Sequence, residues 1–259
     1  MPRRKSSTRV IAIANQKGGT GKTSTAVNLA AGLAELGKRV LLVDCDPQAN
    51  ATVSMGIDYA ETTISLAEVL DGEKLELDSL IVVHGVFVLS SHPNALASIA
   101  RSLSAEQGDQ FRLREALSGI LSEFEFVLID CPPTLSLLTV AALTAATELL
   151  VPVPTEFLSL EGVAQLLDTV EVIRRRFNPE LEILGLLPTR YESRPIGGKV
   201  VLERLADFEV PMLATKIRKN VRIADAPGAG MPVIHYDRRS RGAEDYRALA
   251  REVLGDGTA

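Results

Sequence analysis

Residues 16–23 carry glycines, lysines and a hydroxyl group in an order suited to binding phosphate. They read Gln-Lys-Gly-Gly-Thr-Gly-Lys-Thr, and the last three match the end of a P-loop. The strict P-loop pattern places a glycine where this chain has Gln16. Because glycine has no Cβ, Gly18, Gly19 and Gly21 allow the backbone to curl with its N–H groups facing an anion. The loop is therefore expected to hold the phosphates of a nucleotide.

Two side chains of this loop have distinct predicted roles. Lys22 would reach the β- and γ-phosphates, and the hydroxyl of Thr23 would be a ligand of Mg²⁺. The helix that begins near Lys22 adds the positive end of its dipole and its unpaired N–H groups. A glycine-rich turn that binds nothing is the alternative. The predicted nucleotide contacts of the loop are Gly18, Gly19, Thr20, Gly21, Lys22, Thr23 and Ser24.

The segments on either side of the loop fit this interpretation. Residues 9–14 form a short apolar, β-branched run that predicts a buried strand, and residues 24–36 predict a helix. Further apolar runs alternate with helical patterns, of which the clearest lies between residues 160 and 177. The other predicted strands are residues 39–43, 85–89, 126–129, 148–153 and 181–187. This alternation predicts an α/β fold with a doubly wound, mostly parallel sheet flanked by helices, as in P-loop NTPases.

Acidic residues follow two of the predicted strands. Asp44 and Asp46 follow one strand, and Asp130 follows another. Because ligands bind at the carboxyl ends of parallel strands, these acids are expected beside the phosphates. Asp130 has the sequence context of a Walker B acid, which holds Mg²⁺ directly or, as we expect here, through water. Asp44 is better suited to supporting the loop and the surroundings of the metal. For Asp44 and Asp46, the alternative is a solvated turn that binds nothing.

The composition is that of a globular protein with a substantial core. Of 259 residues, 46% are hydrophobic and 24% are charged, while the net charge of −5 means that nucleic-acid binding would need a local basic patch. No apolar run has the length required to cross a membrane. Cys45 and Cys131 provide no disulfide framework, which favours a reducing cytoplasm, and they imply no iron–sulfur cluster. We expect a flexible basic arm at residues 1–8 and a single domain at residues 9–255.

The sequence Lys-Gly-Gly-Thr-Gly-Lys-Thr-Ser, which begins at Lys17, resembles the deviant Walker A motif of the ParA/MinD ATPases. The resemblance implies that the chain binds ATP with Mg²⁺ and forms a homodimer around it, with Lys17 reaching the nucleotide of the partner subunit. It also implies that Asp46 positions the attacking water, so the expected catalytic residues are Lys17, Lys22 and Asp46. A solvated loop lysine is the alternative role for Lys17.

A second segment, residues 217–227, resembles the ParA/Soj segment that contacts adenine. By this resemblance Asn220 and Arg218 contact the base. The chain departs from the family pattern at Arg218, where proline is usual, and at Lys219, where arginine is usual. Together with the closing segment at residues 236–243, the resemblance extends over residues 9–254 and identifies a ParA/Soj-type partition ATPase, of a chromosome or a plasmid.

Basic residues concentrate in the C-terminal third of this acidic chain. They predict a patch that binds the backbone of double-stranded DNA without sequence specificity; a solvated basic face is the alternative. The predicted DNA contacts are Arg194, Lys199, Arg218, Lys219 and Arg222.

The resemblance implies an ATPase switch in chromosome partition. ATP binding would favour a DNA-bound dimer, and hydrolysis, weak on its own and stimulated by a ParB/Spo0J-type partner, would release it. The protein would be cytoplasmic and associated with the nucleoid. A MinD-like membrane-associated positioning ATPase is the alternative, but residues 251–259 contain too few apolar side chains for stable membrane association. A nucleotide-dependent scaffold that barely hydrolyses ATP is a third possibility.

Overall fold

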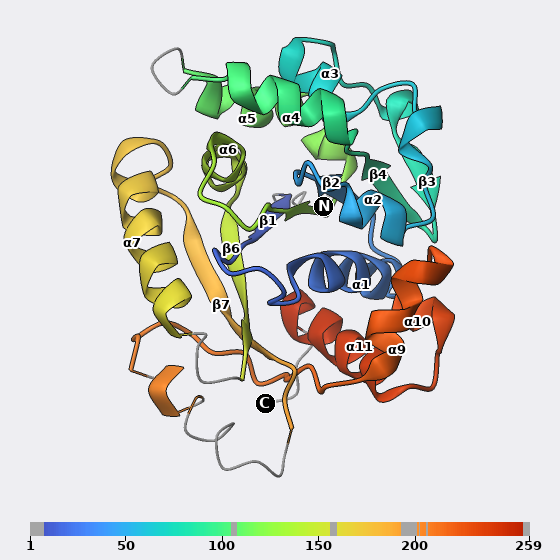
Figure 1. Cartoon of the computed structure of the whole chain (residues 1–259), viewed down its shortest axis with the longest axis vertical. Coiled ribbons are helices and arrows are strands. Elements are labelled where there is room, and N and C mark those ends of the chain that lie inside the picture. The colour runs from blue at the N-terminus through green and yellow to red at the C-terminus, as the bar shows by residue number, and fades with distance from the viewer. Residues whose placement is uncertain are drawn as a thin grey trace, which may run out of the picture.

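The computed structural model describes residues 8–104, 108–155, 160–192, 201, 203–205 and 207–255. In these residues a seven-stranded sheet has the order β3-β4-β2-β5-β1-β6-β7 (Figure 1). Neighbouring strands are parallel except for β3, which is antiparallel to β4. The strands are β1 (Arg9–Ile13), β2 (Val40–Asp44), β3 (Ile81–Val83), β4 (Val86–Leu89), β5 (Phe126–Asp130), β6 (Glu148–Pro154) and β7 (Glu182–Thr189). The predicted doubly wound, mostly parallel α/β sheet is confirmed.

Helices cover both faces of the sheet (Figure 1). On one face lie α3 (Leu66–Asp71), α4 (Pro93–Ser102), α5 (Arg112–Ser118), α6 (Leu137–Ala145) and α7 (Leu160–Arg176). On the other lie α1 (Lys22–Glu35), α2 (Asn50–Ser54), α9 (Val221–Asp225), α10 (Val233–Tyr236) and α11 (Arg241–Leu254). None of the helices in the described residues combines the length and hydrophobicity needed to span a bilayer.

Two hydrophobic cores explain why the strands are continuous apolar runs. Along β1, Val10 and Ala12 face the core beneath α3–α7, whereas Ile11 and Ile13 face the core beneath α1 and α11. Side chains alternate between the faces of a strand, so a strand covered on both sides needs apolar residues at every position. The predicted strands appear within two residues of their expected bounds.

The antiparallel strand β3 was not predicted. It has only three residues, and Val82 at its centre is 56% exposed, so neither length nor hydrophobic pattern distinguishes it from a loop. It follows a turn-rich region and pairs with β4 through Val83 and Val86.

The strand register brings the predicted acids together. Ile13 at the end of β1 pairs with Asp130 at the end of β5, and Asp44 at the end of β2 also pairs with Asp130. The loop after β1 therefore starts beside both acids.

The C-terminal segment is joined to α1 by packing and by a hydrogen bond. In α1, Asn28 accepts a bond from the backbone N–H of Val233 through Oδ1 (2.6 Å), and α11 lies against α1 (Figure 1). A Cβ on Gly32 would lie 2.9 Å from the Cβ of Ala250 and 3.3 Å from the carbonyl oxygen of Tyr246. The two helices can approach this closely because position 32 has no side chain.

The division into an arm and a single domain stays a prediction. Residues 1–7 of the expected arm lie outside the described residues, while the hydroxyl of Thr8 donates to the carbonyl oxygens of Leu121 (2.8 Å) and Phe124 (2.9 Å). The last residue of the expected arm is thus attached to the turn at residues 121–124, just before β5.

Gly32→Ala should destabilise the protein although alanine favours helix formation. The added methyl group would overpack the contact between α1 and α11 and lower the free energy of unfolding by about 1–3 kcal/mol. Urea unfolding measures this change. Gly119→Ala, where nothing lies within 4 Å of the added Cβ, is the control; equal stability of Gly32→Ala and wild type would contradict the packing described here.

Candidate functional site

The loop between β1 and α1 has the conformation that its glycines predict. Gly19 has a φ of 72° and Gly21 has a φ of 92°, both in the left-handed region that favours glycine. Gly21 is the N-cap of α1, and no side chain caps this helix end. The first N–H groups of α1, which begins at Lys22, therefore remain for a ligand, next to the positive end of the helix dipole.

Lys22 is held inside the loop. Its Nζ donates to the carbonyl oxygen of Lys17 (3.2 Å), and only 7% of the residue is exposed. Burial lowers the pKa of Lys22, and the charges of Asp130 and Asp46 oppose that shift. A buried ammonium group at the floor of a cradle of N–H groups is suited to an anion, which would replace the lost hydration.

Asp130 is joined to the loop through Thr23. The Thr23 hydroxyl donates to Oδ2 of Asp130 (2.7 Å), while Oδ1 of Asp130 is buried without a hydrogen-bond partner in the described residues. Burial raises the pKa of Asp130 well above its usual value, and the charge of Asp44 raises it further. A hydroxyl beside an unsatisfied carboxylate oxygen is the oxygen-rich environment that Mg²⁺ prefers, so these residues fit the expected metal.

Asp44 and Asp46 have different environments. Oδ2 of Asp44 accepts hydrogen bonds from the backbone N–H (2.8 Å) and the hydroxyl (2.7 Å) of Thr52, and Oδ1 accepts from the N–H of Asp46 (3.2 Å). Burial raises the pKa of Asp44 to about 6. Asp46 accepts from the N–H of Gln48 (2.9 Å) and lines the cavity described next. Asp44 thus fixes the loop after β2, and Asp46 faces the space where a substrate would bind.

A cavity of about 730 Å³ lies in front of the loop. One wall is formed by residues 18–24, another by Asp46 and Gln48, and a third by the segment after β7 that was predicted to contact adenine. Residues 18–24 line it, as do Arg218 and Asn220, whereas Lys17, which was expected to reach the nucleotide of a second subunit, is not among the lining residues. The structure therefore brings the two resemblance segments, which are distant in sequence, to the same cavity.

Arg218 and Asn220 make contacts that the sequence did not reveal. The guanidinium of Arg218 forms ion pairs with Asp245 (2.6 Å) and Glu244 (3.2 Å), and the backbone N–H of Arg218 also donates to Asp245 (2.8 Å). Oδ1 of Asn220 accepts from the N–H of Arg222 (2.8 Å) as the N-cap of α9. This bond occupies one of the two lone pairs of the amide oxygen, and the residue also lines the cavity.

The described members of the predicted DNA patch are paired with acids. Besides the pairs of Arg218, Lys219 pairs with Glu192 (2.9 Å), and Arg222 pairs with Asp225 (3.4 Å) and Asp237 (3.3 Å). The pairs of Lys219 and Arg222 are exposed, so each contributes little to stability and can open. Arg194 and Lys199 lie outside the described residues.

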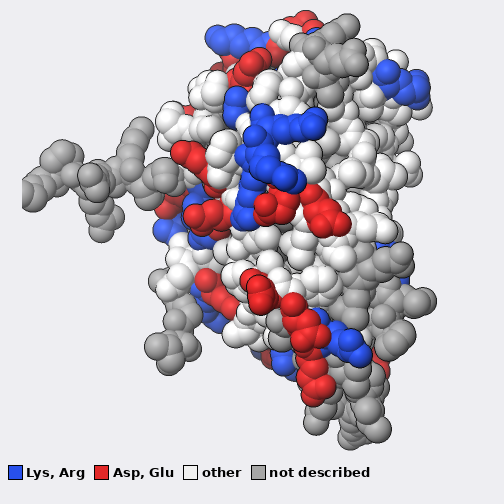
Figure 2. All heavy atoms as spheres, turned by 90° about the vertical axis from the view of Figure 1, so that its left-hand side faces the viewer, with Lys and Arg blue, Asp and Glu red and all other residues white. Residues whose placement is uncertain are grey.

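Another group of cations lies at the end of α7. The last turn of this helix carries Arg174, Arg175 and Arg176. Figure 2 faces the side of the molecule where α7 lies and shows basic side chains gathered there among acidic ones. These arginines lie at the end of α7, whereas Gly162 near the start of the helix is the part close to Lys17.

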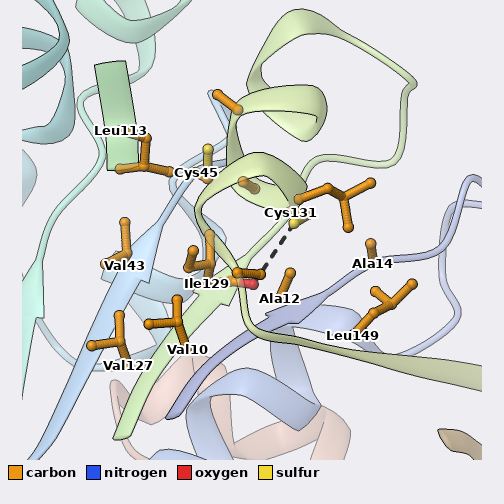
Figure 3. Close-up of a cluster of buried hydrophobic side chains, with 14 of the residues drawn as sticks. Val10, Ala12, Ala14, Val43, Cys45, Leu113, Val127, Ile129, Cys131 and Leu149 are labelled. Carbon is orange, nitrogen blue, oxygen red and sulfur yellow. Dashed lines mark hydrogen bonds between the residues drawn. The ribbon is translucent and has the colours of Figure 1, made fainter. Parts of the chain in front are cut away.

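The two cysteines belong to the core beneath the site. Cys45 and Cys131 follow the last residues of β2 and β5, and both are fully buried among apolar side chains such as Val43 and Ile129 (Figure 3). Burial raises the pKa of both thiols, which makes them poor nucleophiles.

Sequence reasoning missed residues of the site, among them Thr52 and Asp245. Thr52 holds Asp44 from α2, and Asp245 holds Arg218 from α11. Neither lies in a motif, and only the fold brings them close.

Comparisons with known proteins find relatives along most of the chain. Residues 8–183 match the family model described as "AAA domain". The chain is 42% identical over 252 residues to the sporulation initiation inhibitor protein Soj of Bacillus subtilis (strain 168), covering 96% of this chain and 99% of Soj. It is 41% identical over 251 residues to the chromosome partitioning protein ParA of Caulobacter vibrioides (strain NA1000 / CB15N), covering 95% of this chain and 94% of that protein.

Solved structures show the same architecture. A structure named cobyrinic acid a,c-diamide synthase from Mycobacterium smegmatis, with bound ATP analog and magnesium, is 39% identical with a TM-score of 0.85, covering 95% of this chain and 94% of that one. The septum site-determining protein MinD of Pyrococcus horikoshii OT3, complexed with Mg-ADP, is 28% identical with a TM-score of 0.78, covering 95% and 96%.

Asp130→Asn should stabilise the protein while weakening Mg²⁺-dependent ATP binding. The raised pKa means that the folded state binds more protons than the unfolded state above pH 3.8, so stability falls as pH rises from there toward the folded pKa. The amide avoids this loss and can still accept from Thr23. In EDTA at pH 8, we expect the free energy of unfolding to rise by about 1–2 kcal/mol.

Chemical denaturation with and without Mg²⁺ and ATP measures both effects. Asp71→Asn, an exposed substitution at the end of α3, is the control. A less stable Asp130→Asn protein in EDTA would contradict the cost assigned to this buried charge.

Proposed function

This chain belongs to the ParA/Soj family of partition ATPases, and on that premise we propose that it uses ATP binding and hydrolysis to control a DNA-bound dimer in chromosome or plasmid partition. The observation that carries the proposal is the P-loop whose Lys22 and Thr23 meet the buried Asp130. The cofactors are ATP and Mg²⁺. A relative of similar fold, 39% identical to this chain, has an ATP analog and magnesium bound.

Mg²⁺ would be held by Thr23 directly and by Asp130 through water, and when bound it would offset charge on the phosphates. The hydroxyl of Thr23 and the orphaned Oδ1 of Asp130 support this assignment. The backbone N–H groups of the loop and the ammonium group of Lys22 bind the phosphates and stabilise the charge that develops on them.

Asp46 is the proposed residue that orients the attacking water. It lines the cavity, and its Oδ1 accepts from Gln48, which fixes the side chain. Asp44 supports it, since the N–H of Asp46 donates to Asp44. Asp46 therefore has a fixed orientation and faces the cavity, as a water-positioning carboxylate must.

Lys17 is the proposed link between ATP and dimerisation. Its backbone is fixed on both sides, because its N–H donates to Oδ1 of Asn15 (3.0 Å) and its carbonyl oxygen accepts from Lys22. The Cβ of Lys17 is 3.8 Å from the position that a Cβ on Gly162 would take, so the start of α7 lies close to it. With this backbone fixed, the side chain can extend to the nucleotide of a second subunit.

The dimer would bind double-stranded DNA without sequence specificity through the basic C-terminal third. Opening of the exposed pairs of Lys219 and Arg222 would let both residues contact phosphates. A ParB/Spo0J-type protein would stimulate hydrolysis, and the protein would be cytoplasmic and associated with the nucleoid. The fold also resembles MinD, but Tyr246, Leu249 and Val253 of α11 are buried against the domain, which favours the DNA-binding role over a membrane-binding one.

Lys17→Ala should abolish the ATP-dependent dimer and, with it, tight DNA binding. We expect a monomer by light scattering in ATP and Mg²⁺, and loss of DNA affinity in a salt-controlled binding assay, because the bridge between subunits is gone. Lys74→Ala, which removes a lysine that is 84% exposed, is the control. A Lys17→Ala protein that stays dimeric and binds DNA as wild type does would refute the coupling.

Asp46→Asn should separate ATP binding from hydrolysis. The amide keeps an acceptor for the N–H of Gln48 but orients water poorly, so turnover should fall by about 10²-fold or more while ATP affinity is retained. Phosphate release and nucleotide titration measure the two quantities, with Asp71→Asn as control. Turnover equal to that of wild type would assign the water-positioning role to another residue.

A further inference from the structure

The end of β7 lies against the P-loop at consecutive positions. The Thr189 hydroxyl donates to the carbonyl oxygen of Thr20 (2.9 Å), and Cγ2 of Thr189 is 3.8 Å from the position that a Cβ on Gly21 would take. Nη2 of the next residue, Arg190, is 3.7 Å from the position that a Cβ on Gly19 would take. The guanidinium of Arg190 therefore lies beside the loop backbone and lines the cavity.

An unusual backbone conformation makes this arrangement possible. In a regular strand, consecutive side chains point to opposite faces, so Thr189 and Arg190 could not both reach one loop. Arg190 has a φ of 52°, in the left-handed region that non-glycine residues rarely adopt, and this turn brings its side chain to the same side. Such strain persists where surrounding contacts impose it, and it is concentrated at ligand sites.

The neighbouring backbone holds Arg190 in that conformation. The N–H of Thr155 donates to the carbonyl oxygen of Thr189 (3.0 Å). The hydroxyl of Thr155 donates to the carbonyl oxygen of Arg190 (3.4 Å). On the other side, the N–H of Tyr191 donates to the carbonyl oxygen of Ile217 (3.0 Å). The position is thus determined by Thr155, which follows β6, and by the segment after β7, not by the arginine itself.

Besides Arg190, three other cations among the described residues line the cavity, namely Lys22, Arg218 and Lys219. Lys22 lies at the floor of the loop, while Arg218 and Lys219 extend to carboxylates of α11 and of residue 192. Arg190 lies at the loop, and its guanidinium is a planar fork of N–H donors that matches phosphate oxygens.

We infer that Arg190 is a nucleotide-binding residue that donates to the polyphosphate of ATP held in the P-loop of the same chain, from the β7 side. This inference rests on the proposed function, since it requires ATP in this loop. It adds a side chain outside the three segments on which the family resemblance was stated, the loop from Lys17 and residues 217–227 and 236–243.

Competitive binding tests the inference. A fluorescent ATP analogue bound to the full chain is displaced by ATP or by inorganic tripolyphosphate, each with Mg²⁺. Arg190→Gln should weaken both competitors about tenfold, as expected for the loss of a charge-assisted hydrogen bond. Arg190→Lys should weaken them less, because it keeps the charge but not the fork. Arg176→Gln, an equal charge change at the exposed end of α7, should bind as wild type does.

A glycine variant separates binding from folding. Arg190→Gly suits the left-handed backbone, so it should be at least as stable as wild type in thermal unfolding and yet lose affinity as Arg190→Gln does. Unchanged ATP affinity in both variants would overturn the inference. Weaker ATP binding with unchanged tripolyphosphate binding would also overturn it, because the contact would then be to the base or sugar. A wild-type chain that binds no ATP would instead overturn the proposed function.

Discussion

The interaction on which the site depends is the contact between Thr23 and Asp130 beneath a loop of N–H groups. It forms because β1 and β5 are paired in a register that ends both strands at the same edge of the sheet. The carboxylates of Asp130 and Asp44 and the ammonium group of Lys22 are thereby buried close together at this edge of the sheet. Burying charges costs free energy unless they are paired, and these are only partly paired. A magnesium ion and a polyphosphate would supply the missing charges.

The C-terminal segment completes this site from the other side. α11 packs on α1 through the small residue Gly32, and the same helix provides Asp245, which holds Arg218. The segment after β7 is thereby fixed across the cavity from the P-loop. Nucleotide phosphates and base would bind to parts of the chain that are about 200 residues apart, and the packing of α11 on α1 fixes the distance between them.

Much of this architecture could be predicted because it depends on local patterns. Continuous apolar runs identify strands covered on both faces, and glycines followed by Lys22 and Thr23 identify the loop. The bond from Thr52 to Asp44 and the pairing of Arg218 with Asp245 could not be predicted, because each joins elements that only the fold brings together. The φ of Arg190 likewise results from contacts with Thr155 and Ile217, not from its own residue type. The predicted DNA contacts of Arg194 and Lys199 stay predictions, because both residues lie outside the described part of the chain.

The most direct test of the account is a crystal structure of this chain with a non-hydrolysable ATP analogue and Mg²⁺. The account predicts the polyphosphate in the loop of residues 16–23, and the metal about 2.1 Å from the hydroxyl of Thr23 on the side of Asp130. It also predicts a second chain whose Lys17 contacts these phosphates. A nucleotide bound outside the loop, or a metal remote from Thr23 and Asp130, would contradict it.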